Sequence, residues 1–298
     1  MGRKKTAREW FKEGIELDTV DPCSEKALEA YEKSIELDGN YADAYVNSGF
    51  IYLQKKDFEK AEECFSKLLE IEPDNPETYN NLGYVYERME RFGSAKQMYE
   101  KSLEIDQGNI ESVINLALIA DLQGNYKQAI EQYKKAIQID PRTVHPYFCM
   151  ALLYDQYDMF DEAIEFYQQT LGLDPDHTKA LFNLGNLHVQ NGNYQKAIEL
   201  FKKTLQLNPD NSQAWNNLGS VYEEIKKYDE AVSAYRKSIS LNSFQEEAHF
   251  NLARIEYLHD PPNLSSAKKK EIIQRLQLVT SINPKHIRAK QFLYKMKS

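Results

Sequence analysis

The sequence predicts an all-α fold in which antiparallel helix pairs stack side by side as an α-solenoid. The first observation is a period of 34 residues, a length typical of repeat proteins. Small residues recur at this period, at Gly49, Gly83, Ala117, Ala151, Gly185, Gly219 and Ala253. The second observation is that an alanine follows each of the first six small residues by twelve positions, and an aromatic residue follows that alanine by four. No alternating strand pattern competes with this reading.

Residues 178–211 show how one unit forms a helix pair. Apolar and small residues mark one helix face at three-to-four spacing, at Leu181, Leu184, Gly185 and Leu187. Gly192 and Asn193 end this helix, and a second apolar face follows from Tyr194 to Leu205. Pro209 then closes the unit. Because neither helix can bury its apolar face alone, neighbouring units must stack.

The same pattern divides nearly the whole chain. We expect a basic N-terminal tail at residues 1–6 and a single solenoid at 7–298. Its units are 7–41, 42–75, 76–109, 110–143, 144–177, 178–211, 212–245, an atypical 246–285 and a capping helix at 286–298. In the first unit Ala27 falls one residue late, and we expect the loop 18–24 to absorb the extra residue. In the last unit residues 259–263 interrupt the pattern, so the second helix is expected at 265–282.

These residues resemble the tetratricopeptide repeat family. The resemblance rests on the small residue, the alanine and the aromatic residue that recur in phase over six or seven units. It implies a right-handed superhelix whose first helices line an inner groove. It also implies a protein-interaction role in which the groove holds a segment of another protein.

The resemblance places the sixth residue of each first helix on the inner groove. Six of seven such positions are asparagine: Asn47, Asn81, Asn115, Asn183, Asn217 and Asn251, with Cys149 at the seventh. An amide both donates and accepts, so a row of amides can pair with the backbone of an extended peptide without reading its side chains. The groove of the O-linked N-acetylglucosamine transferases is similar in this respect. Alternatively, each asparagine bonds the backbone of an adjacent unit and holds the stack, and both roles are compatible.

Other groove positions carry acidic and aromatic side chains. The candidate acidic residues are Glu77, Glu111, Asp121 and Asp155, and the candidate apolar contacts are Phe148 and Phe182. Together they suit a peptide with basic and apolar side chains. The alternative for the carboxylates is solvated surface. The chain lacks the lysine at position 5 that family members use to clamp acidic chaperone tails, so we do not expect that subtype.

Charge is unevenly distributed along the chain. The net charge is -9, yet residues 261–298 contain nine basic residues against the single acid Glu271. The candidate basic patch comprises Lys268, Lys269, Lys270, Arg275 and Arg288. Such an end can dock an acidic partner, an anionic membrane surface or nucleic acid. The alternative is a solubilising cap on the stack.

Motifs for chemistry are missing from the sequence. Cys23, Cys64 and Cys149 form no CxxC pair, and no HxxxH, Walker or GxSxG motif occurs. We therefore expect no catalytic residue, no cofactor and no metal, and neither a small molecule nor nucleic acid as the main ligand. No apolar run is long enough to span a membrane, and we expect a cytoplasmic location.

The sequence thus predicts a non-catalytic scaffold or adaptor that binds an extended or helical peptide. The alternatives are a regulatory or targeting subunit of a larger enzyme or secretion assembly, and binding to an anionic surface through the basic end. The sequence leaves the oligomeric state open.

Overall fold

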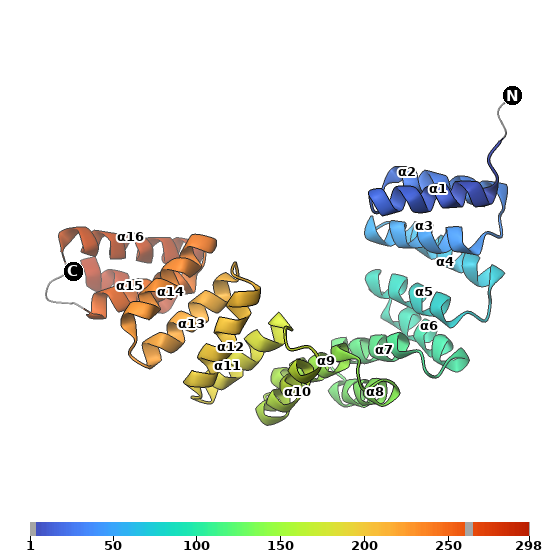
Figure 1. Ribbon diagram of the computed structural model, residues 1–298. Helices are drawn as coiled ribbons and strands as arrows, with labels where there is room; N and C mark the ends of the chain where they lie inside the picture. Colours follow the sequence, from blue (N-terminus) through green and yellow to red (C-terminus); the bar gives the residue numbers. More distant parts are fainter. Residues whose placement is uncertain (1–3, 260–264, 298) are drawn as a thin grey trace. The chain divides into compact units, whose positions relative to one another are not determined.

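The computed structural model describes residues 4–259 and 265–297, which form 17 helices and no strand (Figure 1). The first helices of the pairs are α1 (Ala7–Val20), α3 (Ala42–Gln54), α5 (Pro76–Arg88), α7 (Ile110–Leu122), α9 (Val144–Gln156), α11 (Thr178–Gln190), α13 (Ser212–Glu224) and α15 (Glu246–His259). The second helices are α2 (Glu25–Leu37), α4 (Phe58–Ile71), α6 (Phe92–Ile105), α8 (Tyr126–Ile139), α10 (Phe160–Leu173), α12 (Tyr194–Leu207), α14 (Tyr228–Leu241) and α16 (Ser266–Ile282), and α17 (Ile287–Lys297) follows. This confirms the predicted all-α class of stacked helix pairs.

The chain forms two compact units, called unit 1 (residues 1–146) and unit 2 (residues 147–298) below. Within each unit, helices pack mainly against the helix before and the helix after them in the sequence. First helices of successive pairs also touch, as α5 does with α7 and α13 with α15. These first helices form the walls of the grooves described below.

Helix boundaries follow local sequence chemistry. Asn75 caps α5 by accepting hydrogen bonds from the backbone of Glu77 and Thr78, and Pro76 occupies the first turn, where its missing N–H costs nothing. The turns inside the pairs need a residue with positive φ. Gly124 and Gly192 supply it without steric cost, whereas Lys56, Glu90, Asp158 and Lys226 adopt it against their preference.

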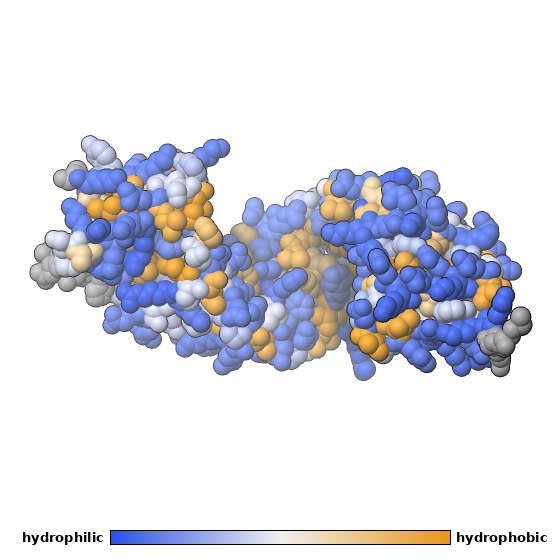
Figure 2. All heavy atoms as spheres, turned by 90° about the horizontal axis from the view of Figure 1, so that it is seen from above, coloured by the Kyte–Doolittle hydropathy of each residue, from blue (hydrophilic) through white to orange (hydrophobic). Residues whose placement is uncertain are grey.

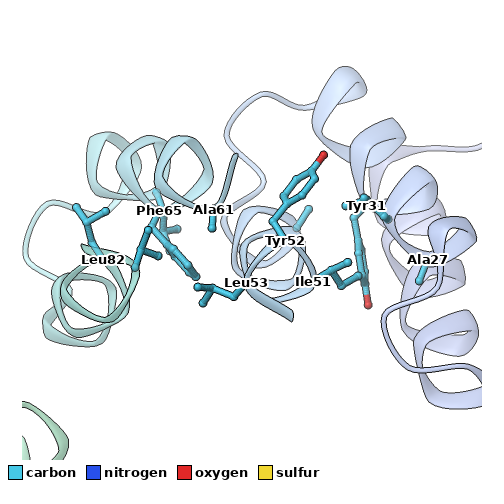
Figure 3. Close-up of a cluster of buried hydrophobic side chains, with 12 residues drawn as sticks. Ala27, Tyr31, Ile51, Tyr52, Leu53, Ala61, Phe65 and Leu82 are labelled. Carbon is cyan, nitrogen blue, oxygen red and sulfur yellow. The ribbon is translucent and has the colours of Figure 1, made fainter. Parts of the chain in front are cut away.

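The core of each regular helix pair repeats one contact among three residues: the small residue of the first helix, and the alanine and the aromatic residue of the second. In the pair α5–α6, Ala95 and Tyr99 are fully buried, and a Cβ added to Gly83 would lie 2.6 Å from the Tyr99 ring. The small residue therefore allows the ring to lie flat between the helices. Figure 3 shows the equivalent contact in unit 1, where Phe65 of α4 lies near Leu53 of α3 and Leu82 of the next pair. The aromatic residue at this position thus packs between the two helices of its own pair and also against the next pair.

The first and last pairs depart from the regular pattern. Helix α1 continues to Val20, so the extra residue lies in the helix and only Asp21–Ser24 forms the turn, shorter than the expected loop. Ser265 caps α16, which reaches Ile282 as expected. Residues 260–264, most of the expected interruption, lie outside the described residues. Among the described residues, no helix is long and apolar enough to cross a membrane.

Candidate functional site

The N-terminal groove is a hollow in unit 1 with a volume of about 480 Å³. Its lining comes from α3, α5, α7 and the turns before α5 and α7: Val46, Phe50, Asn75, Glu77, Thr78, Asn80, Asn81, Asn109, Ile110 and Glu111. Phe50 is 43% exposed, and Tyr84 on α5 is 38% exposed. The lining contains two carboxylates, three apolar side chains and no cation. On the face shown in Figure 2, apolar side chains lie in small groups among hydrophilic ones.

The C-terminal groove is a larger hollow in unit 2, with a volume of about 1020 Å³. Its lining is Asn186, Val189, Gln190, Asn216, Asn217, Ser220, Glu224, Glu247, Phe250, Asn251, Arg254, Asn283, Lys285, His286, Ile287 and Arg288. These residues come from α11, α13 and α15, and from α17 with the turn before it. Both linings are rich in side-chain amides, but this one also contains three cations, Arg254, Lys285 and Arg288, beside the carboxylates Glu224 and Glu247.

The predicted asparagines sit on equivalent positions of the first helices, and three of them line a groove: Asn81, Asn217 and Asn251. Several donate to a side chain of the preceding pair. Asn115 Nδ2 donates to Asn80 Oδ1 at 3.0 Å, and Asn217 Nδ2 donates to Asn186 Oδ1 at 2.8 Å. In the described residues, nothing donates to the Asn115 or Asn251 Oδ1, and Asn81 makes no hydrogen bond.

The tyrosine hydroxyl is the other partner of these asparagines. Asn183 Nδ2 donates to the Tyr167 hydroxyl at 3.1 Å, and hydrogen bonding from Asn47 opposes the rise that burial causes in the pKa of Tyr31. The partners are therefore side chains rather than the backbone considered above. Each such amide is held in place from one side and keeps an acceptor on the other.

A second row of asparagines, which the sequence reasoning did not single out, connects the helix pairs. Asn80 is buried, accepts from Ser112 Oγ at 3.0 Å as well as from Asn115, and donates to Glu111 Oε2 at 3.2 Å. Asn216 is likewise buried, and it accepts from Asn251 and donates to Asn217. The signal was available in the sequence, because Asn80 and Asn216 directly precede Asn81 and Asn217.

The four predicted groove carboxylates separate into two kinds. Glu77 and Glu111 are exposed and line the N-terminal groove, as expected. Asp155 instead accepts from the Tyr167 hydroxyl at 3.3 Å, and Asp121 has a buried Oδ1 without a hydrogen-bond partner among the described residues. The expectation that Asp155 serves a peptide is therefore corrected, because its carboxylate accepts from a core tyrosine, whereas for the half-exposed Asp121 the expectation stays a prediction.

The carboxylate at this position accompanies a tyrosine in the core. Glu87 accepts from the Tyr99 hydroxyl at 3.0 Å, and Glu223 accepts from the Tyr235 hydroxyl at 3.0 Å. Where the core aromatic is phenylalanine, the position is apolar instead: Leu53 accompanies Phe65, and Val189 accompanies Phe201. The carboxylate thus satisfies a hydroxyl that would otherwise be buried without a partner.

Burial sets the titration of these carboxylates. It raises the pKa of Glu87, with hydrogen bonding from Tyr99 and the charge of Arg88 opposing the shift. Burial likewise raises the pKa of Asp121 and of Asp155. These groups lose hydration on folding, a cost that a free surface carboxylate does not have.

One of the two predicted aromatic contacts differs from expectation. Phe148 is only 8% exposed, and its ring packs 6.1 Å from Tyr167 and 4.5 Å from His177. It is a core residue, so its assignment to the groove surface is corrected. Phe182 is half-buried and packs 5.9 Å from the Phe201 ring. The exposed aromatic surface of unit 1 comes instead from Phe50 and Tyr84.

Part of the predicted basic patch is used inside the protein. Glu256, whose side chain is 5% exposed, binds Lys268 at 2.8 Å, Arg236 at 3.0 Å and also Arg275. Lys268 and Arg275 therefore fasten α16 to α15, which corrects their assignment to a free patch. Lys269 and Lys270 are exposed on α16, whereas Arg288 lines the C-terminal groove. The predicted patch is thus divided among three roles.

Comparison with known families identifies the repeat. Models described as tetratricopeptide repeat match residues 40–108, 152–212 and 183–246, and one described as TPR repeat matches residues 122–156. Together they cover well over half of the chain, which therefore belongs to the tetratricopeptide repeat family. No curated protein matches the sequence.

Solved structures share the fold at low identity. The chain is similar to one in the crystal structure of the APC/C hetero-tetramer Cut9–Hcn1, with 21% identity and a TM-score of 0.59 over 96% of this chain and 59% of that one. It is also similar to PilF of Pseudomonas aeruginosa, with 19% identity and a TM-score of 0.62 over 74% of this chain and 97% of that one. It is similar as well to the chain in a crystal structure of MamA, with 22% identity and a TM-score of 0.51 over 58% of this chain and 97% of that one. This chain thus spans little more than half of the Cut9–Hcn1 chain that it matches.

The family and the fold support one broad function. Proteins built from these repeats are generally scaffolds that bind other proteins, and the repeats of this chain support a protein-interaction scaffold.

Proposed function

We propose that the chain is a non-catalytic, cytoplasmic adaptor that holds an extended segment of a partner protein against the first helices. The observation that carries the proposal is the state of the groove amides. Asn251 in the C-terminal groove is held by a hydrogen bond to the preceding pair and keeps an open carbonyl oxygen, and Asn81 in the N-terminal groove makes no hydrogen bond in the described residues and keeps its whole amide open. Open acceptors on a fixed scaffold can take the N–H groups of a peptide backbone without the entropy cost of ordering a free side chain.

The N-terminal groove supports a partner segment with basic and apolar side chains. Glu77 and Glu111 supply negative charge, and Phe50 offers exposed apolar surface beside them. Backbone pairing by amides contributes affinity, and these side chains contribute preference. Asp155 and Phe148 have no part in this proposal, because Asp155 accepts from a core tyrosine and Phe148 is buried.

Peptide selection on the full-length chain tests the proposal. A random library of extended peptides, displayed on phage, is selected on the chain, and the affinities of the selected peptides are measured. Asn81→Ala is expected to lower the affinity for peptides bound in the N-terminal groove about tenfold, because one or two hydrogen bonds are lost. The melting temperature should stay unchanged. Asn191→Ala, an exposed asparagine outside both grooves, is the matched control.

Three outcomes decide the proposal. Loss of affinity in Asn81→Ala but not in Asn191→Ala supports it. Unchanged affinity, with cross-linking of the peptides outside both grooves, contradicts it. Stable co-purification with an enzyme or a secretion complex through surfaces outside the grooves would instead favour the subunit alternative.

A further inference from the structure

Unit 2 has a hollow that is distinct from both grooves and is called the α12–α14 hollow below. Its volume is about 430 Å³, and its lining comes from α12, α13 and α14, which pack against one another in chain order (Figure 1). Helix α13 lines it with Trp215, Leu218 and Tyr222. The same helix lines the C-terminal groove with other residues, among them Asn217 and Ser220. The hollow is therefore a separate surface of unit 2.

The α12–α14 hollow offers the surface of aromatic rings. Trp215 and Tyr222 are half-buried and pack against the buried apolar cluster around Phe201. Trp215 Nε1 donates to the Pro209 carbonyl oxygen at 2.9 Å. Because this bond satisfies the one polar atom of the indole, the ring offers apolar contact to anything that enters the hollow.

The equivalent place in the pair α9–α10 is filled by a ring of the chain itself. Phe166 of α10 stacks on Tyr154, with 5.4 Å between the ring centres, and its ring centre lies 6.4 Å from that of Tyr147. Two periods of 34 residues later, the residues that correspond to Tyr147, Tyr154 and Phe166 are Trp215, Tyr222 and Ala234. Ala234 lines the hollow and lacks the ring that covers the two aromatic residues in the earlier pair.

The small side chain of Ala234 is unusual for its position in the repeat. In the regular pairs before it, the same position holds the larger residues Cys64, Met98, Gln132, Phe166 and Leu200. The atypical first pair has Ala30 there, but Lys5 and Lys33 cover the corresponding Trp10 ring, with Nζ atoms 4.2 and 4.5 Å from its centre. Within the described part of the chain, no cation lies over Trp215 in this way.

We infer that the α12–α14 hollow binds a phenylalanine side chain of a partner protein, in the place that Phe166 takes in its own pair. The volume of about 430 Å³ lies in the range of sites that enclose a ligand group. An aromatic side chain that enters such a pocket buries a large apolar area, and anchors of this kind dominate the energy of many interfaces.

Two charged side chains define what flanks this phenylalanine. Lys202 of α12 and Glu230 of α14 are exposed and line the hollow, and neither makes an ion pair in the described residues. They stand on different helices and carry opposite charges. A partner with a carboxylate on one side of its phenylalanine and a basic side chain on the other therefore complements both.

This site goes beyond the proposed function. The grooves would hold a peptide backbone against the first helices, whereas the α12–α14 hollow takes a single side chain and is lined partly by second helices. Occupation of one surface leaves the other open, so the two can be tested separately.

Tryptophan fluorescence of the full-length chain tests whether the hollow accepts a ring. The chain has two tryptophans, so Trp10→Phe leaves Trp215 as the sole reporter. In this background, Ala234→Phe copies the native Phe166 and should shift the Trp215 emission to shorter wavelengths without lowering the melting temperature. Ser240→Phe, at an exposed position of α14 outside the hollow, is the matched control and should leave the emission unchanged. A folded Ala234→Phe chain with unchanged emission overturns the inference.

Peptide selection tests the partner chemistry. Phage-displayed peptides of random sequence around a fixed phenylalanine are selected on the full-length chain with excess Ala234→Phe chain as competitor. Replacing the fixed phenylalanine by alanine should lower the affinity of the selected peptides at least about tenfold. Their binding should shift the Trp215 emission and weaken in Lys202→Glu, but not in Lys237→Glu, an exposed lysine of α14 outside the hollow.

Each result of this selection decides the inference. Peptides that meet these criteria support it, and Lys202→Glu with the Trp215 emission still decides if Ala234→Phe does not fold. A selection without binders, or binders insensitive to Lys202→Glu that leave the emission unchanged, overturns it. Self-association of the native chain that Ala234→Phe abolishes would make a second copy the occupant and overturn the assignment to a partner protein. Asn81→Ala reports on the proposed function independently, because it should not affect these peptides.

Discussion

At the scale of single residues, the central finding is that the core aromatic residue of a helix pair occurs in two combinations with a residue of the first helix. A core tyrosine is accompanied by a carboxylate, as in Tyr99 with Glu87, and a core phenylalanine is accompanied by an apolar residue, as in Phe65 with Leu53. A hydroxyl buried without a partner costs about 1–3 kcal/mol. The two residues therefore act as one unit, and changing only one of them should destabilise the protein.

A double-mutant cycle at Tyr99 and Glu87 tests this coupling. Tyr99→Phe should lower the free energy of unfolding by about 1–2 kcal/mol, because Glu87 loses its hydrogen-bond donor in a half-buried site. The double variant Tyr99→Phe/Glu87→Leu copies the native pair Phe65 and Leu53 and should recover most of that loss. Urea unfolding of the four proteins measures the coupling energy. Additive single effects would show that the hydrogen bond is incidental.

The pH dependence of stability gives a second prediction at this scale. Burial raises the pKa of Glu87 in the folded state, so folding disfavours its charged form. The folded protein then binds more protons than the unfolded chain between the two pKa values, and this group adds stability as pH falls through that window. Glu87→Gln, which resembles the protonated acid, should therefore be more stable than the native chain at about pH 7 and nearly equal at about pH 4.5.

Thermal melting at the two pH values measures this difference. Glu59→Gln on the exposed face of α4 serves as a control that should show no such convergence. A variant that is less stable at neutral pH would show that the charged carboxylate is favoured by its Tyr99 hydrogen bond more than it is penalised by burial.

At the scale of helices, ion pairs join the last pair in addition to its apolar cluster. Glu256 of α15 is nearly buried and receives Lys268 and Arg275 from α16 and Arg236 from α14. Burial alone would raise the pKa of Glu256, but the hydrogen bond from Lys268 and the charge of Arg275 hold that pKa below its usual value. The stabilisation is therefore present above the unfolded pKa and is lost as pH falls through the folded pKa.

Removing this charge should loosen the end of unit 2. Glu256→Gln is expected to cost about 1.5–3 kcal/mol, the range for hydrogen bonds to charged groups. Hydrogen exchange should accelerate in α16 and α17 and remain unchanged in unit 1. Glu271→Gln is the matched control, because Glu271 contacts the same Lys268 and Arg275 from a side chain that is 54% exposed. Equal effects of the two variants would contradict a special role for Glu256.

The helices could be predicted from the sequence more fully than the site. Prolines and asparagines at pair ends and the 34-residue period locate most helix boundaries, since each acts through local backbone chemistry. The roles of Asp121, Asp155 and Phe148 could not be assigned in this way, because an inner position of a helix can face either the groove or the next pair. Only the packing of Tyr167 against Asp155 and Phe148 decides between them.

At the scale of the whole molecule, stability should be local rather than shared by the entire chain. Helices contact mainly their sequence neighbours, and the contacts divide the chain into residues 1–146 and 147–298. In such arrays, stability is approximately a sum of repeat and nearest-neighbour terms. Damage in one unit should therefore spread to adjacent pairs and fade with distance along the chain.

A charged substitution at a core alanine tests this property. Ala231 is fully buried in α14, so Ala231→Asp places a carboxylate where it has neither space nor a partner, at a cost of more than about 3 kcal/mol. Hydrogen exchange should show that α13, α14 and α15 lose protection, while α3 to α6 keep theirs. Because peptide binding in the N-terminal groove depends only on α3, α5 and α7, that affinity should survive in the same variant. Simultaneous loss of protection in both units would instead mean that the chain folds as one cooperative body, and a segment bound at one groove could then stabilise the other.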